Sequence, residues 1–383
     1  MKTLNHFKLV LLPAVFFMMA GYAYSYPPDN AAVLYYKVIA TYQADDEMTK
    51  MLEDLCKDKI VMNDKIKEFV KKNRLIVDTV LEASEIKNCD WGLDFSQGIK
   101  MELPHLSNMR KLAYLVIADA KIQAKDGNYD TAISRCVSAY KMARHINDRN
   151  YVIYLVGISI NALTNNCVMQ IMADMPQDTQ SLTNLKKQLM EIDSIPFPIK
   201  PAILAERECT LKFMTKEQFP DVVKLCEMDE STKKKLLSLD ENAISQNRTY
   251  FENYYNVVIA AFDMPYLQGC AAFKNLEKKL KEDANSNPDA ILTNVVSPSS
   301  DKIFSLTTRF KTHNNAIKTA IEIYLIKAKT SKLPDTLSAD LPGDLFSGKP
   351  FIYEKTAEGF ILRCQGQDLP KKETYEYKFK VKQ

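Results

Sequence analysis

The stretch Leu341-Pro-Gly-Asp-Leu-Phe-Ser-Gly-Lys-Pro-Phe-Ile-Tyr353 marks the place where the sequence changes from helical to strand periodicity. Phe351 and Tyr353 lie two positions apart, and Phe360 and Leu362 repeat this spacing after a short connection. Alternation of apolar residues is typical of strands with one buried face. We therefore predict an antiparallel β-hairpin whose connection is Glu354 to Gly359.

The region before this hairpin has the periodicity of a long helix. Asp301 to Thr330 contains no proline or glycine, and apolar residues recur there at spacings of three and four. Residues 285–300 are rich in Asn, Ser, Asp and Pro, which is typical of a connecting segment. We predict a linker at 285–300, followed by a C-terminal α+β module at 301–383 made of one long helix and the hairpin.

Residues 26–284 have the pattern of an irregular helical domain, so the predicted fold class is mainly α. Tyr151–Met175 is strongly apolar but carries Asn161 and Asn165, which favours a buried helix over a membrane span. The predicted helices are Ala31–Gln43, Asn63–Ile86, Lys111–Lys125, Tyr129–Ile146, Tyr151–Met175, Ser181–Ile195, 202–218, 230–263 and 266–283.

Residues 107–146 contain the clearest internal motif. Gly127 stands in the turn between two helices, Tyr129 follows it, and Ala132 and Ala139 are small residues where the helices would cross. This segment resembles one tetratricopeptide (TPR) hairpin of about 34 residues. Because a second copy with the same markers is missing from the sequence, we expect a single TPR-like hairpin rather than a repeat array.

The first 25 residues have the features of a secretory signal peptide. Lys2 and Lys8 give a positive start, Leu9–Ala20 is apolar, and Ala23-Tyr24-Ser25 places small residues at a cleavage site. An uncleaved anchor is the alternative, and no membrane span is expected once residues 1–25 are removed. We therefore predict an exported protein of the periplasm or cell envelope.

Composition excludes nucleic acid as a partner but does not decide whether the cysteines form disulfides. The formal net charge is +3 at pH 7, which gives no electrostatic basis for binding nucleic acid. Export permits disulfides among the eight cysteines, and none of them forms a CxxC pair of the zinc or redox type. We expect Cys136 and Cys167 to be buried thiols. Cys56 with Cys89 and Cys209 with Cys226 are the first disulfides to test.

The sequence contains no P-loop, GxGxxG, HExxH or EF-hand pattern, so no cofactor is predicted and a non-catalytic role is favoured. His105, at a predicted helix start, is the leading catalytic candidate. His145 is expected to cap a helix end, where a charged imidazolium would complement the helix dipole. Glu206 and Arg207 lie in an apolar helix and could serve a site, although a structural ion pair is favoured. Trp91, the single tryptophan, could bind a ligand, although a packing role is favoured.

Two resemblances concern larger segments. Residues 315–368 are similar to the C-terminal part of type II secretion pseudopilins, and the matching residues are Ala320-Ile321, Tyr324, Leu333-Pro334, Asp344-Leu-Phe-Ser-Gly-Lys-Pro350 and Gly366-Gln-Asp368. Leu345 stands where proline is usual, and the prepilin N-terminal sequence is missing. The resemblance implies a reused scaffold, with Asp344 and Asp368 as weak candidates for calcium ligands; otherwise no metal is expected.

The whole mature chain also resembles a family of uncharacterised exported proteins of planctomycete-type bacteria, including anammox lineages. The matching residues are Pro28-Asp-Asn-Ala-Ala32, Tyr35-Tyr36, Asp90-Trp-Gly92, Leu103-Pro-His-Leu106, Arg110, Glu206-Arg207 and Phe346-Ser-Gly-Lys-Pro350. This resemblance implies a location and a shared fold but no activity.

These observations lead to two hypotheses about function. The first is a non-catalytic scaffold of the periplasm or cell envelope that presents a helical groove to a protein or peptide partner. The second is an envelope hydrolase with its site between the 90–105 loop and the 203–209 helix. Convergence of His105 and Glu206 in one pocket would favour the hydrolase.

Overall fold

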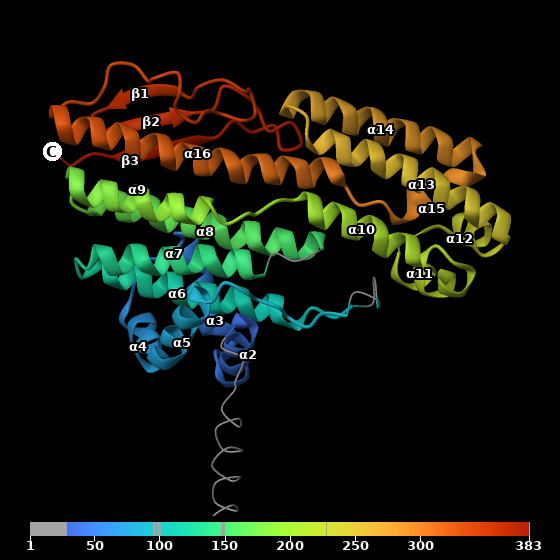
Figure 1. Ribbon diagram of the computed structural model, residues 1–383, viewed down its shortest axis with the longest axis horizontal. Helices are drawn as coiled ribbons and strands as arrows, with labels where there is room; N and C mark the ends of the chain where they lie inside the picture. The colour runs from blue at the N-terminus through green and yellow to red at the C-terminus, as the bar shows by residue number, and fades with distance from the viewer. Residues whose placement is uncertain (1–28, 95–96, 98–100, 147–149, 227, 383) are drawn as a thin grey trace, which may run out of the picture.

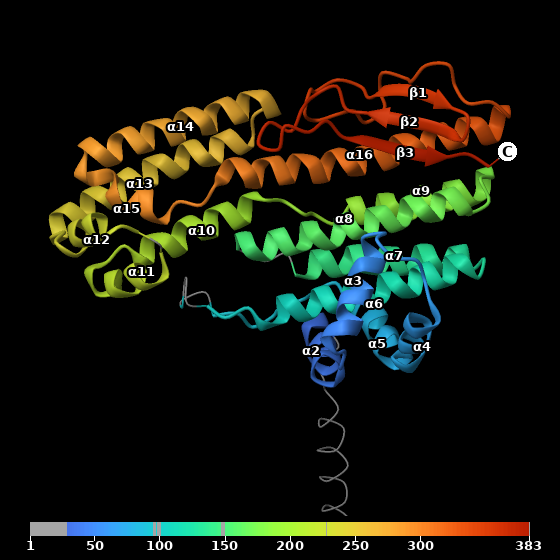
Figure 2. The same cartoon turned by 180° about the vertical axis from the view of Figure 1, so that it is seen from behind.

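The computed structural model describes residues 29–94, 97, 101–146, 150–226 and 228–382. The signal peptide predicted for residues 1–25 lies outside this part of the chain. The described residues are mainly helical, with a three-stranded antiparallel sheet near the C-terminus. Figures 1 and 2 show the helices stacked in layers, with the sheet along one long edge and α11–α15 at one end. The prediction of a mainly α fold is confirmed.

The first four described helices form a small group that packs on α6. They are α2 (Ala31–Thr41), α3 (Asp46–Cys56), α4 (Asp64–Lys72) and α5 (Arg74–Glu85). The single helix predicted over 63–86 is wrong, because the chain breaks at Asn73, whose side-chain amide donates to the Phe69 carbonyl at 2.9 Å and so ends α4. Sequence analysis also omitted α3, which Asp45 caps by accepting a hydrogen bond from the Met48 N–H at 2.7 Å.

The central layers are formed by α6 (Pro104–Lys125), α7 (Tyr129–His145), α8 (Tyr151–Asp174) and α9 (Thr179–Asp193). The first two form the predicted helix–turn–helix pair. Gly127 adopts a φ of 80° in its turn, a left-handed conformation that glycine adopts without steric cost. Ala132 and Ala139 are fully buried, which allows α7 to lie close to its neighbours.

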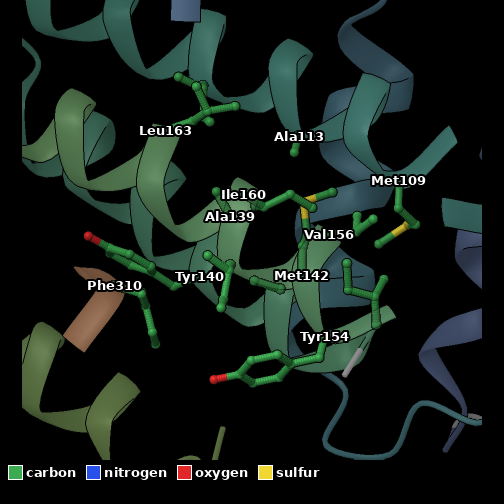
Figure 3. Packing of buried hydrophobic residues seen from close by; sticks show 14 of the residues in the cluster. Met109, Ala113, Ala139, Tyr140, Met142, Tyr154, Val156, Ile160, Leu163 and Phe310 are labelled. Carbon is green, nitrogen blue, oxygen red and sulfur yellow. The ribbon is translucent and has the colours of Figure 1, made fainter. Parts of the chain in front are cut away.

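Helix α8 is the centre of the array. It contacts α6, α7 and α16, and Figure 3 shows its Tyr154, Val156, Ile160 and Leu163 packed with residues of those helices. It is the one helix of the described part that is long and apolar enough to cross a membrane, and 67% of its apolar window is buried inside the protein. This burial agrees with the prediction of a core helix.

The far end of the molecule contains α10 (Lys200–Phe213), α11 (Phe219–Leu225), α12 (Glu230–Leu237), α13 (Glu241–Phe262), α14 (Tyr266–Ser286) and α15 (Ile291–Val296). The single helix predicted over 230–263 is wrong, because Asp240 begins a new helix by capping the Ala243 N–H at 2.8 Å. The segment 285–300, expected to be a linker, contains α15 and packs on α13. There the Asn247 side chain accepts from the Leu292 N–H at 3.0 Å.

The C-terminal unit consists of α16 (Ser300–Thr330) and the strands β1 (Ile352–Thr356), β2 (Gly359–Arg363) and β3 (Glu376–Lys380). The predicted two-stranded hairpin is present as β1 and β2, but β3 extends it to a sheet of order β1-β2-β3. Phe360 pairs with Phe379, and both rings contact Tyr324 of α16. Sequence analysis missed β3 although Tyr377 and Phe379 alternate with polar residues.

The cysteines of the described chain are thiols rather than disulfides. Cys56 is buried and its Sγ donates to the Tyr114 carbonyl at 3.6 Å, and Cys226 is a half-buried thiol. The disulfides suggested for Cys56 with Cys89 and Cys209 with Cys226 are therefore not formed. Cys136 and Cys167 are buried thiols, as predicted; a hydrogen bond between them, together with burial, raises the pKa of Cys136.

Asp119 is the buried charge that joins α5, α6 and α7. Its carboxylate is 2% exposed and accepts from Arg74 Nη1 at 3.0 Å and from Arg135 Nε at 2.9 Å. Arg74 also binds Asp78 on its own helix at 2.8 Å, but Asp78 is 55% exposed. A buried carboxylate between two arginines is costly to neutralise, whereas an exposed ion pair contributes little.

We expect Asp119→Asn to lower the free energy of unfolding by about 3 kcal/mol, because the two guanidinium groups lose their buried counter-charge. The matched substitution Asp78→Asn, which removes the exposed partner of the same arginine, should change it by less than about 0.5 kcal/mol. Urea unfolding followed by circular dichroism measures both. Equal losses in the two variants would contradict this role for Asp119.

Candidate functional site

Trp91 lies in an aromatic stack and not in an open site. Its ring stacks on Tyr35, at a centroid distance of 5.7 Å, and on His105, at 4.4 Å. Its Nε1 donates to the His145 carbonyl at 2.8 Å, and the ring is 4% exposed. Trp91 therefore packs α2 against the ends of α6 and α7, which is the packing role favoured by the sequence.

His105, which stacks on Trp91, is only 1% exposed. Its two ring nitrogens have no hydrogen-bond partner among the described residues. Burial lowers its pKa to about 4, so the ring is neutral at pH 7. A general base needs contact with the proton that it removes, and this buried ring offers a substrate almost no surface.

His145 is the last residue of α7, but it does not act as a charged cap. Its Nδ1 lies 3.0 Å from the Tyr35 hydroxyl, and its ring also hydrogen-bonds the backbone of Ile86. Burial lowers its pKa to about 4, so the imidazole is neutral at pH 7. The expectation that a charged His145 complements the helix dipole is wrong.

Glu206 and Arg207 lie on α10, close to the start of α8. The Glu206 carboxylate accepts from the backbone N–H of Tyr151, the first residue of α8, where negative charge complements the helix dipole. Burial raises its pKa, and this hydrogen bond partly opposes the effect. Arg207 has a buried Nε without a hydrogen-bond partner among the described residues. No ion pair joins either side chain to another residue of the described chain.

Asp344 and Asp368 anchor two loops of similar geometry. In each loop the aspartate N–H donates to the carbonyl five residues later, at 2.8 Å in both cases. Asp344 Oδ2 also accepts from the backbone N–H groups of Gln365 and Gly366 at 2.9 and 2.8 Å. A side chain at Gly366 would collide with the Phe346 backbone, which explains the glycine there.

The carboxylate of Asp368 also accepts hydrogen bonds from protein groups. It accepts from the Ser305 hydroxyl at 2.6 Å and from the Tyr375 hydroxyl at 2.7 Å. Calcium usually takes six or more oxygen ligands. Because hydrogen bonds from the protein already occupy both carboxylates, Asp344 and Asp368 are placed as loop anchors and not around a common cation position.

A cleft of about 1000 Å³ opens where α5, α7 and α9 end. This is the upper part of the usual size range of ligand sites. Lys141 Nζ forms an ion pair across it with Glu85 at 2.5 Å. Trp91, His105, Glu206 and Arg207 are not among its lining residues, which are Ser84, Glu85, Ile86, Lys87, Asn88, Cys89, Asp90, Lys141, Arg144, His145, Glu191, Ser194, Ile195 and Pro196.

Arg144 is the cleft residue with the most unusual surroundings. Its Nη1 donates to Asn161 Oδ1 at 2.6 Å and to the Tyr140 carbonyl at 3.3 Å, and its guanidinium carbon lies 5.3 Å from the centre of the Phe197 ring. Burial lowers its pKa to about 10, so it stays charged at pH 7. Sequence analysis did not select Arg144. A signal was present, because Cys136, Tyr140 and Arg144 lie four residues apart on one face and the first two are buried.

No protein-family model, curated protein or solved structure matches this chain. The resemblances to pseudopilins and to exported planctomycete-type proteins therefore stay predictions.

The buried histidines predict how stability depends on pH. His105, His145 and His313 each have a pKa lowered from 6.5 to about 4 in the folded state. Between these values the unfolded chain binds more protons than the folded chain, so stability should fall as pH decreases from 6.5 to 4. His105→Phe, which keeps an aromatic ring beside Trp91, should reduce this slope by up to about 1.4 kcal/mol per pH unit.

Urea unfolding at a series of pH values measures that slope. Subtracting the wild-type and His105→Phe curves removes the contribution of the carboxylates, which also titrate near pH 4. An unchanged slope would contradict the buried, neutral state of His105.

We expect Asp344→Asn to lower the free energy of unfolding by about 2 to 3 kcal/mol, because an amide cannot accept all the hydrogen bonds that reach this buried carboxylate. Asp340→Asn, an exposed aspartate of the preceding turn, is the matched control and should have little effect. Calcium or EDTA at millimolar concentration should leave the melting temperature unchanged. A rise with calcium that Asp344→Asn abolishes would instead support a metal site.

Proposed function

We propose that this protein is a non-catalytic scaffold of the periplasm or cell envelope that binds a segment of a protein partner in the cleft between α5, α7 and α9. The single observation that carries the proposal is the cleft itself, about 1000 Å³ between the ends of packed helices. Pre-formed concave sites on rigid elements are typical binding sites. Export is part of the proposal and rests on the sequence of residues 1–25.

The chemistry of the cleft suits a polypeptide segment. Lys87 and Asp90 bring opposite charges on the segment that follows α5, and Ile195 and Pro196 bring apolar surface after α9. A peptide combines apolar side chains, amide groups and charges of both signs, so it can use all these groups together. A flat or uniformly charged surface would not offer this combination.

The α6–α7 pair supports a TPR-like description of the scaffold. In TPR-like proteins, stacked helical pairs form concave surfaces that bind peptides. Here the hairpin has the turn Gly127 with buried Ala132 and Ala139, and α7 contributes Lys141 and Arg144 to the cleft. The TPR-like character is therefore part of what we propose.

The alternative, an envelope hydrolase between the 90–105 loop and the 203–209 helix, has weaker support. His105 is 1% exposed and stacked on Trp91, whereas Glu206 binds the start of α8. No described contact brings His105 and Glu206 together. We therefore favour binding over catalysis.

Site-directed photocrosslinking in the native envelope tests the proposal. A photoreactive amino acid at Asn88, which lines the cleft, should capture one protein reproducibly. The same amino acid at Lys278, an exposed position on α14, should not capture that protein. Filling the cleft with Ser194→Trp should then reduce capture from Asn88.

Equal capture from Asn88 and Lys278, or capture that Ser194→Trp leaves unchanged, would contradict binding in the cleft. Turnover of an envelope substrate that His105→Phe abolishes while circular dichroism stays unchanged would favour the hydrolase.

A further inference from the structure

Arg144 is a partly buried arginine whose hydrogen-bond partners among the described residues are all neutral. Arg74 and Arg135 in the same array share the carboxylate of Asp119, whereas Arg144 binds a side-chain amide and a backbone carbonyl. Its Nε is buried and has no hydrogen-bond partner among the described residues. A guanidinium group removed from water favours a carboxylate, which accepts two parallel hydrogen bonds from it.

The acidic groups near Arg144 do not fill this role. Asp193 is close enough to interact electrostatically, but its carboxylate is bound to Lys318 Nζ at 2.7 Å. Across the cleft, Glu85 is bound to Lys141 at 2.5 Å. Glu191 also lines the cleft, but its side chain is exposed and forms no ion pair within the described chain. Arg144 therefore lines a cleft large enough for a ligand, and no carboxylate of the described residues forms an ion pair with it.

We propose that the cleft recognises a carboxylate group, which pairs with the guanidinium of Arg144. Two sources have this chemistry, the C-terminal carboxylate of a polypeptide and the side chain of an Asp or Glu residue. The inference rests on the proposed function, because the same cleft would hold the partner segment. It adds that the partner presents an anion at the point where the cleft reaches α7.

The surroundings of Arg144 favour an organic carboxylate over a free inorganic anion. The cationic groups Lys87 and Lys141 are balanced by Glu85 and Asp90, which also line the cleft, so the cleft as a whole does not concentrate anions. Ile195 and Pro196 provide apolar surface for the carbon skeleton that carries the carboxylate. The guanidinium packs against the rings of Phe197 and Tyr140, with its carbon 5.3 and 5.9 Å from their centres.

The reactivity of Arg144 toward phenylglyoxal tests the proposal without any substitution. Mass spectrometry of the whole mature protein follows the modification rate of each arginine in the presence of N-acetylalanine, of N-acetylalanine amide, or of the α-amide of N-acetylaspartate. A carboxylate at about four times its dissociation constant should slow modification of Arg144 about fivefold, because only one fifth of the sites stay empty. The amide, which lacks the carboxylate, should have no effect.

Arg135 is the internal control in the same digest, because it is partly buried but already paired with Asp119. Its rate should be the same with all three compounds. Stronger protection by N-acetylalanine would identify a C-terminal carboxylate as the ligand group, and stronger protection by the aspartate derivative would identify a side chain. Equal rates at Arg144 with the amide and with both carboxylates would overturn the proposal.

Arg144→Lys provides a second measurement, because it keeps the charge but loses the two-pronged geometry. The protecting carboxylate should raise the melting temperature of the wild type and not that of the variant; equal shifts would overturn the proposal. If Asn88 still captures the partner in Arg144→Lys and carboxylates do not protect Arg144 of the wild type, this inference is wrong and the proposed function stands. If carboxylates protect Arg144 but no protein is captured, the cleft is a site for small carboxylates and the scaffold proposal is wrong.

Discussion

The structure depends on satisfying the polar groups in the interior of a long, mostly buried helix. Helix α8 contacts α6, α7 and α16, and Asn161 and Asn165 lie in its interior at 0% and 1% exposure. A buried amide without partners is costly. Each of these amides is therefore paired across a helix interface, and the pairs constrain how the neighbouring helices align with α8.

These pairs connect α8 with α7, the helix before it in the sequence, and with the distant α16. Asn165 accepts from the Tyr140 hydroxyl of α7 at 2.6 Å and donates to Asn314 of α16 at 2.8 Å. Asn161 accepts from Arg144 at 2.6 Å and donates to the Gly157 carbonyl at 2.8 Å. The same network that holds α7 and α16 on α8 thus holds the Arg144 guanidinium beside the cleft, and it does so with neutral acceptors. The core thus gives Arg144 only neutral hydrogen-bond acceptors among the described residues, and the proposed carboxylate ligand rests on this arrangement.

The sequence predicted the elements better than it predicted their contacts. Periodicity was sufficient for α8, for α16 and for the α6–α7 pair with its turn glycine, because each has a long apolar face. It was insufficient at Asn73 and Asp240, where a single side-chain hydrogen bond ends or begins a helix inside a continuous helical pattern. It also selected His105 and Trp91 by residue type, whereas the structure stacks them on each other in the core. The cleft was beyond prediction, because α5, α7 and α9 meet there only after folding.

Hydrogen–deuterium exchange of the protein, with and without a partner identified by photocrosslinking from Asn88, tests the central claim most directly. Binding in the cleft predicts that protection against exchange increases in the segments that line it, residues 84–90, 141–145 and 191–196. It predicts no change in the loops at 344–349 and 368–373 or in α12. Protection confined to those loops or to α12, with the three cleft segments unchanged, would contradict the assignment of this cleft as the binding site.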